Sequence, residues 1–300
     1  ILEKENSKKN GFFRGVQRYE CNSCGAQFQN KRRDHLSAIL WREYTNDHAT
    51  VPVLVRRYGL SEKTIRTKLH AYTPTKHIPV PRAMVAIGDA TYCGPHSWML
   101  VIRDPHAHEN VYAKELWSET ASAYQEARWR LEEAGFIITA FVGDGRVATP
   151  LLFSDIPVQM CHFHQEQIVA RYTTRNPHLL AGKELLALAG TLSTNDGASF
   201  TDAFKLWCRT WSEFLKEKTI DPKTKRFSWT HKRLRAARES IKIHLPYLYI
   251  FEKYPELNIP NTTNSLDGSF KKVKMAIGVH SGLPRARKLK LITALLGVSV

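Results

Sequence analysis

Three aspartates stand where side chains could carry out chemistry. Asp89 lies in the segment IGDAT, Asp144 in VGDG and Asp267 in TTNSLDG. Three carboxylates that share one pocket repel one another, and they ionise together only when cations neutralise them. Two Mg²⁺ or Mn²⁺ ions, roughly 3.5–4 Å apart, would neutralise them, activate an attacking oxygen and stabilise a leaving oxygen at phosphorus. These three aspartates are therefore the predicted catalytic residues and metal ligands.

Each aspartate also has a plainer interpretation. Gly-Asp and Gly-Asp-Gly are ordinary turn sequences, so Asp89 and Asp144 could simply shape turns. Asp267 could be a negative charge near the start of a helix, three residues after an Asn264 cap. The chemical interpretation is favoured only by the joint placement of the three residues on the elements expected around them.

Residues 81–164 are predicted to form the core that positions the first two aspartates. Short apolar runs indicate strands at 84–90, 98–103, 111–117, 136–142 and 156–160, and helices are expected at 119–134 and 147–153. This order predicts an α/β fold of the RNase H-like class, with a mixed five-stranded sheet. Asp89 would end the first strand and Asp144 would follow the fourth, its neighbour in the sheet.

The rest of the chain is expected to be mostly helical. Residues 165–260 form a predicted helical insertion, and residues 261–300 carry a last helix that starts near Asn264. On that helix Lys271 and Lys274 fall four and seven residues after Asp267, so they either contact DNA phosphates or form a solvated face. In the insertion, Trp229 lies among basic residues and could stack on an unpaired base. Trp207 and Trp211, four residues apart, are predicted core residues.

Two sulfur-containing motifs indicate metal or structural roles. Residues 1–40 contain Cys21 and Cys24 in a C-x2-C turn followed by glycine, which suits two of the four ligands of a zinc ion. The remaining ligands are expected upstream of Ile1, and the alternative is a pair of ordinary thiols. Five cysteines without a secretory signal argue for a reducing compartment.

Residues 41–80 predict a helix-turn-helix that binds DNA. A first helix at 50–58, a Gly59 turn and a Ser61 cap lead into a second helix, on which Ile65 and Leu69 would face the core. The outward residues would donate to phosphates and base edges, and they are Lys63, Thr64, Arg66, Thr67 and Lys68.

Charge is distributed unevenly along the sequence. The chain carries a net +16, with +8 over residues 1–80, −4 over residues 81–164 and +12 over residues 165–300. Basic flanks suit a polyanion such as double-stranded DNA, and an acidic middle suits divalent metal. A solvated basic surface is the alternative. The longest apolar stretches, such as residues 291–300, are about half of what a membrane span needs, so no membrane contact is expected.

The chain resembles the DDE transposases of bacterial insertion sequences, in the broad group related to Mutator-like elements. The resemblance covers nearly the whole chain, from the cysteine pair and helix-turn-helix to the GDAT and GDG segments. Its most specific parts are QMCHFH at 159–164, TTNSLDG at 262–268 and the closing segment that runs from KKVK to HSGL at 271–283. Such enzymes usually carry Glu at the third acidic position, where this sequence has Asp267, one methylene shorter.

The resemblance implies a transposase that hydrolyses a phosphodiester and then uses the freed 3′-hydroxyl to attack target DNA. It also implies a C-x2-H element, Cys161 and His164, which either packs the insertion against the catalytic edge or contacts DNA. Its partners would be the terminal inverted repeats, target DNA and further copies of the chain, in a dimer or larger assembly of the cytoplasm and nucleoid. The alternatives are a transposase-derived DNA-binding protein that no longer cuts and an RNase H-like nuclease.

Overall fold

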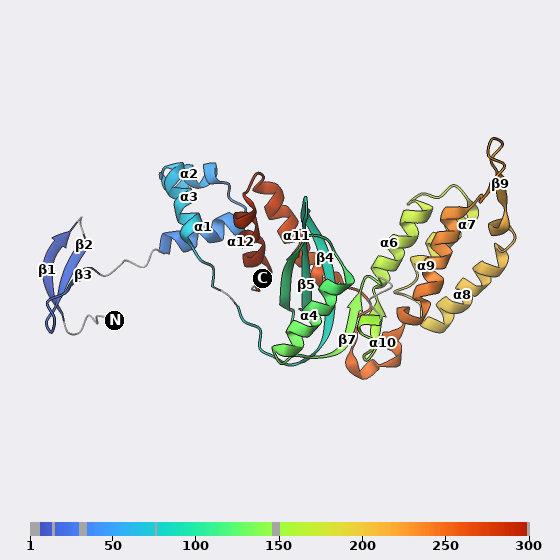
Figure 1. The fold of residues 1–300 in the computed structure, drawn as a ribbon, viewed down its shortest axis with the longest axis horizontal. Coiled ribbons are helices and arrows are strands. Elements are labelled where there is room, and N and C mark those ends of the chain that lie inside the picture. The colour runs from blue at the N-terminus through green and yellow to red at the C-terminus, as the bar shows by residue number, and fades with distance from the viewer. Residues whose placement is uncertain (1–6, 14–15, 30–34, 76, 146–150, 299–300) are drawn as a thin grey trace. The chain divides into compact units, whose positions relative to one another are not determined.

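The computed structural model describes residues 7–13, 16–29, 35–75, 77–145 and 151–298. The chain divides into two compact units, Ile1–Pro74 and Thr75–Val300. Figure 1 shows the elements of both units along the chain. The helix expected at 147–153 falls largely on residues 146–150, which lie outside the described part of the chain.

The first unit contains a small sheet and three helices. Strands β1 (Ser7–Phe13), β2 (Val16–Cys21) and β3 (Gln27–Gln29) pair antiparallel in the order β1-β2-β3. Tyr19 and Phe28 stack across β2 and β3, with ring centroids 5.9 Å apart. This sheet was not expected, because its strands are short and mostly polar and carry little period-two hydrophobic signal.

Helices α1 (His35–Thr45), α2 (Val51–Tyr58) and α3 (Glu62–Ala71) complete the first unit. Gly59 ends α2 in the left-handed conformation, with φ of 63°, and its N–H donates to the Val55 carbonyl. Ser61 caps α3, since its side chain accepts from the Thr64 N–H. Ile65 and Leu69 are buried as the periodicity predicts.

The second unit is built on a mixed five-stranded sheet in the order β6-β5-β4-β7-β8. Strands β4 (Ala83–Gly94), β5 (Ser97–Asp104) and β6 (Glu109–Leu116) form an antiparallel meander. Strands β7 (Ile137–Gly143) and β8 (Val158–Met160) then add in parallel on the other side of β4. The α/β class and the mixed sheet are as predicted, and they are compatible with an RNase H-like core.

Helices cover both faces of this sheet (Figure 1). Helix α4 (Ala121–Glu133) buries Ala123, Tyr124, Ala127 and Leu131 against one face, where Phe141 stacks on Phe153 with ring centroids 4.1 Å apart. Helices α11 (Asn264–Val279) and α12 (Arg285–Leu296) bury their apolar residues against the other face. Apolar residues on both faces of the central strands make this three-layer arrangement necessary.

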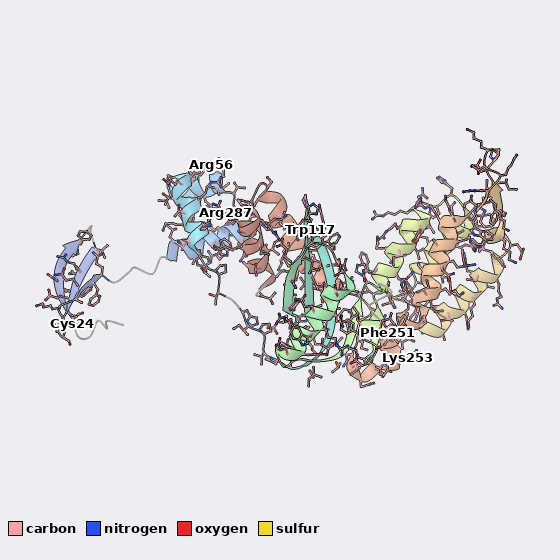
Figure 2. The ribbon with its side chains drawn as sticks, in the orientation of Figure 1. Cys24, Arg56, Trp117, Phe251, Lys253 and Arg287 are labelled. Carbon is pink, nitrogen blue, oxygen red and sulfur yellow. The ribbon has the colours of Figure 1, made fainter. Side chains whose placement is uncertain are left out.

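The predicted insertion is helical and leaves the sheet after β8. It comprises α6 (His162–Thr173), α7 (Leu180–Ala189), α8 (Gly197–Thr210), α9 (Lys232–Leu248) and α10 (Ile250–Lys253), and a β9 (Lys218–Ile220) and β10 (Phe227–Trp229) hairpin that was not expected. Its core includes Trp207, and Trp211 packs against that core, as predicted. Phe251, labelled in Figure 2, packs against both this core and the core beneath α11.

None of the described helices is long and apolar enough to cross a membrane.

Two boundaries differ from the predictions in ways that affect the aspartates. Strand β4 runs to Gly94, so Asp89 lies within the strand and not at its end. Pairing with β5 continues to Gly94, whereas the described pairing with β7 stops at Ile87, so Asp89 lies two residues beyond the end of that second pairing. Helix α11 begins at Asn264 with Thr263 as its cap, so Asn264 is not the capping residue.

A buried glutamine joins the insertion to the sheet. Gln159 Nε2 donates to the carbonyls of Leu248, at 2.6 Å, and Met160, and its Oε1 accepts from the N–H groups of Ile250 and Phe251. Leu248, Ile250 and Phe251 lie at the break between α9 and α10, where backbone groups lose their helical partners.

Replacing Gln159 by Leu should therefore lower the free energy of unfolding by about 3 kcal/mol, because several buried backbone groups lose their partner. Urea denaturation of the full chain measures this effect. The matched control is Gln125→Leu on the exposed side of α4, which should change stability by less than about 0.5 kcal/mol. Equal stability of the two variants would contradict the structural role of Gln159.

Candidate active site

The three predicted aspartates line one open groove of about 650 Å³ in the second unit. Asp89 comes from β4, Asp144 from the segment after β7, and Asp267 from the first turn of α11. More than 170 positions of sequence separate the first from the last, so only the fold can bring them to one groove. The other lining residues are Ala90, Thr91, Glu119, His164, Arg171, Phe270, Lys271, Lys274 and Met275.

Asp89 is largely enclosed by the residues around it. Its side chain is 14% exposed, and one oxygen accepts from the Ala90 N–H at 2.8 Å. Burial raises the pKa of Asp89 to about 6; His164 and the Ala90 N–H act against this rise, and Asp144 and Glu119 add to it. A carboxylate held in such surroundings is stabilised by any cation that enters the groove.

Asp144 is held by tight packing beneath the segment that carries it. The adjacent Gly145 has φ of +73°, and a Cβ there would lie 1.8 Å from the Sδ of Met160, which is buried. The ring of His244, on α9, hydrogen-bonds the Gly145 backbone, and its Nδ1 lies 2.6 Å from Oε1 of Gln165 on α6. The insertion therefore contacts the backbone next to the second aspartate.

Asp267 is placed by the apolar side of α11. Leu266, Phe270 and Val273 are buried against the sheet, with the spacing of one helix face. Asp267 follows Leu266 by one position and is exposed toward the groove. Lys271 and Lys274 line the same groove, as the four- and seven-residue spacing predicts.

The Cys161 and His164 motif links the parts of the groove. The Cys161 N–H donates to the Gly143 carbonyl at 2.8 Å, and the Cys161 sulfur accepts from the N–H of Thr263, the cap of α11. Cys161 is fully buried, so it ties the strand before Asp144 to the helix that carries Asp267. These contacts are to β7 and to the start of α11, and the two roles that the resemblance implied for the motif stay predictions.

His164 lies in the groove itself. Its Nε2 is 3.8 Å from an Asp89 oxygen. Burial alone would lower the pKa of His164, but the adjacent Cys161 thiol and the carboxylates of Asp89 and Asp144 outweigh it and raise the pKa to about 9. The Nδ1 atom is buried, and it makes no hydrogen bond of good geometry with any residue that the structure describes.

Glu119 and Arg171 complete the groove, and neither was predicted. Glu119 follows the C-terminal end of β6. Because β6 runs in the same direction as β4, the loop that carries Glu119 lies at the sheet edge where the C-terminal half of β4, with Asp89, also lies. Its carboxylate accepts from the Tyr124 hydroxyl at 2.8 Å. Arg171 lies seven residues after His164 on α6, hence on the same helix face. Strand direction and helix periodicity were the signals for these two residues.

The donor chemistry of the groove suits a hard divalent cation. Asp89, Asp144, Asp267 and Glu119 supply carboxylate oxygens, which Mg²⁺ and Mn²⁺ prefer as ligands. Within the described residues, no three His, Cys, Asp or Glu side chains form a group already arranged to hold a metal ion. The carboxylates thus share a groove without forming a closed ligand set.

The remaining predicted residues are distributed over both units. In the first unit, Lys63, Arg66 and Thr67 are exposed on α3, Thr64 and Lys68 are half-buried, and Arg66 pairs with Glu62 at 2.7 Å. Cys21 and Cys24 flank a tight turn, and hydrogen bonds from the Ser23 and Cys24 backbone lower the pKa of the Cys21 thiol. In the second unit, the Trp229 ring is half-buried beneath Arg235, whose Cζ lies 3.9 Å from the ring centroid.

A comparison with protein-family models and with curated proteins finds no match for this chain.

Proposed function

We propose that this protein is a DNA transposase of the DDE type, which cleaves DNA at the ends of an insertion sequence and transfers the freed strand to target DNA. The observation that carries the proposal is the shared groove lined by Asp89, Asp144 and Asp267. Three acidic residues, one from a strand, one from the segment after the next strand in the sheet and one from a helix, suit metal-assisted phosphoryl transfer. The basic residues around them suit a polyanionic substrate.

The groove residues have distinct parts in this proposal. Asp89, Asp144 and Asp267, with Glu119 beside them, would hold two Mg²⁺ or Mn²⁺ ions, which supply charge neutralisation and activation of the attacking oxygen when bound. Lys271, Lys274 and Arg171 would bind the phosphates that flank the scissile bond and hold the strand in line. Cys161 would keep the aspartates in position, and His164 would bring a positive charge next to Asp89.

The first unit would recognise DNA in this proposal. Helix α3 would present Lys63, Thr64, Arg66, Thr67 and Lys68 as the second helix of a helix-turn-helix. Cys21 and Cys24 would contribute two of the four ligands of a zinc ion. A dimer or larger assembly would hold two transposon ends together, and the protein would act on the nucleoid in the cytoplasm.

Cleavage of the flanking repeats tests the proposal against its two alternatives. The full chain with Mg²⁺ is incubated with a duplex of any inverted repeats found on either side of its gene, with a scrambled duplex, and with an RNA–DNA hybrid of equal length. The expected result is nicking at the repeat boundary, with transfer of the 3′-hydroxyl end to a supercoiled plasmid. Preferential cutting of the hybrid would indicate an RNase H-like nuclease, and binding without cutting would indicate a DNA-binding protein that has lost cleavage.

A further inference from the structure

The β9–β10 hairpin of the insertion is an exposed arm with an excess of positive charge. Every residue from 216 to 228 is exposed, including Ile220 at 63% and Phe227 at 60%. Between Lys216 and Arg235 the sequence carries eight Lys or Arg residues against two carboxylates. Figure 1 shows the hairpin, labelled β9, at the end of the insertion that lies away from the sheet. An isolated two-stranded ribbon without a core beneath it is at most marginally stable, so its stability must come from elsewhere.

The base of the hairpin is held by aromatic and cationic side chains. Arg235 lies over the Trp229 ring and donates from Nη1 to the Leu215 carbonyl at 2.8 Å. His231 stacks on Phe214 with ring centroids 3.8 Å apart, and its Nε2 lies 2.9 Å from a Glu217 oxygen. The base is therefore anchored to the helical insertion.

The strands themselves are bridged by a lysine. Lys218 is directly opposite Trp229, and its ammonium group lies 4.5 Å from the Phe227 ring centroid and 5.2 Å from that of Trp229. Such cation–π contacts order a ribbon without burying it. Phe227 and Ile220 face each other across the strands and share this side of the ribbon.

The tip of the hairpin is a hydrogen-bonded turn that presents three cations. Asp221 shapes it, since its Oδ1 accepts from the N–H groups of Lys223 and Thr224 and its backbone pairs with Arg226. Among the residues that the structure describes, Lys223, Lys225 and Arg226 form no ion pair with a carboxylate. A turn that keeps three cationic side chains exposed and without a carboxylate partner is suited to binding a polyanion.

The hairpin connects to the groove through the helices. Arg171, which lines the groove, has its carbonyl bound by Nη2 of Arg233, at the start of α9 next to the hairpin base. His164 and Arg171 lie on one face of α6 at a spacing of about 10 Å, which equals the rise of about three base pairs along the axis of a DNA duplex. Cationic side chains thus continue from the groove along α6 to the hairpin.

We infer that the β9–β10 hairpin is a DNA-binding arm that inserts into the major groove of duplex DNA beyond the cleavage site. A major groove, about 12 Å wide and 8.5 Å deep, admits a two-stranded ribbon. Lys223, Lys225 and Arg226 contact the phosphates on its edges, and Phe227 and Ile220 face the base edges. The inference rests on the proposed function for its substrate, DNA, but it requires no catalysis.

The test is the salt dependence of duplex binding by the full chain. Fluorescence anisotropy with a labelled 40-base-pair duplex is measured in EDTA, so that neither metal nor cleavage is needed. The triple variant Lys223→Gln, Lys225→Gln and Arg226→Gln should reduce the slope of log K against log salt by about 2 to 3, since each lost phosphate contact contributes about 0.9. Phe227→Ser in the unaltered background should weaken binding by about threefold at unchanged slope, because it removes apolar contact but no charge.

The matched control removes the same charge elsewhere on the insertion. Lys183, Lys205 and Lys253 are exposed on helices α7, α8 and α10, and Lys253 is labelled in Figure 2. Their triple Gln variant should leave the slope within about 0.5 of the wild-type value, because no phosphate contact is lost. Equal slopes of log K against log salt for the two triple variants would overturn the inference, even if both variants cleave DNA.

The other polyanions give contrasting outcomes. The hairpin triple variant could bind duplex DNA as the wild type does but lose affinity for single-stranded DNA or for phosphatidylglycerol vesicles. That result would overturn the inference that the hairpin binds duplex DNA. Retained duplex binding by the wild type without any cleavage would contradict the proposed function and leave the hairpin inference intact.

Discussion

Replacing Asp89 by Asn is expected to reduce strand cleavage by about 10³-fold, because the carboxylate loses its charge while its shape is kept, and metal-assisted stabilisation of several kcal/mol is lost. The Asp89 side chain is only 14% exposed, so water replaces its lost charge poorly. Cleavage of the terminal-repeat duplex in Mg²⁺ measures the loss. Duplex binding in EDTA should stay within about twofold, since most of its affinity comes from phosphate contacts elsewhere.

A second measurement links this effect to metal. Saturating Mn²⁺ should raise the unfolding free energy of the wild type by about 2.7 kcal/mol at one hundred times the dissociation constant. Asp89→Asn should lose most of this increment. The control is Asp202→Asn, an exposed aspartate of α8 that pairs with Lys205 and should keep both cleavage and the Mn²⁺ effect. Cleavage at the wild-type rate by Asp89→Asn would contradict the proposed role of Asp89 in metal-assisted phosphoryl transfer.

Gly145→Ala is expected to reduce cleavage by about 10²-fold, the effect of moving a reacting group by about 1 Å. The added methyl group would meet the buried Met160 sulfur at 1.8 Å, and alanine is strained at a φ of +73°. Relief of this contact must shift either Met160 or the segment that carries Asp144. Single-turnover cleavage measures the effect, and the urea midpoint shows how much stability is lost.

The control for this variant adds the same methyl group beside the third aspartate. Gly268 follows Asp267 on α11, and a Cβ at this position meets no atom within 4 Å. Gly268→Ala should leave cleavage within about twofold and should stabilise the helix by about 0.5–1 kcal/mol. Equal activity of Gly145→Ala and the wild type would show that the segment after β7 accommodates the methyl group without moving Asp144.

Local periodicity was enough to predict most of the core. The three apolar runs before residue 117 became the meander β4-β5-β6, and the run at 136–142 became β7, because a strand buried on both faces must be continuously apolar. On α11 the positions of Lys271 and Lys274 relative to Asp267 followed from helix geometry alone. The cap at Ser61 and the turn at Gly59 likewise depend only on neighbouring residues.

Long-range contacts decided what local patterns could not. The sequence alone showed which acidic, basic and C-x2-H residues belong to which predicted strand or helix, since these assignments depend on only a few neighbouring positions. Only the tertiary structure brought Asp89, Asp144, Asp267, Glu119 and Arg171 to one groove, because that requires pairing between segments up to 178 positions apart. It also formed the β9–β10 hairpin, whose strands of three residues are too short for a hydrophobic period and whose stability comes from Arg235 and Lys218 packing on aromatic rings.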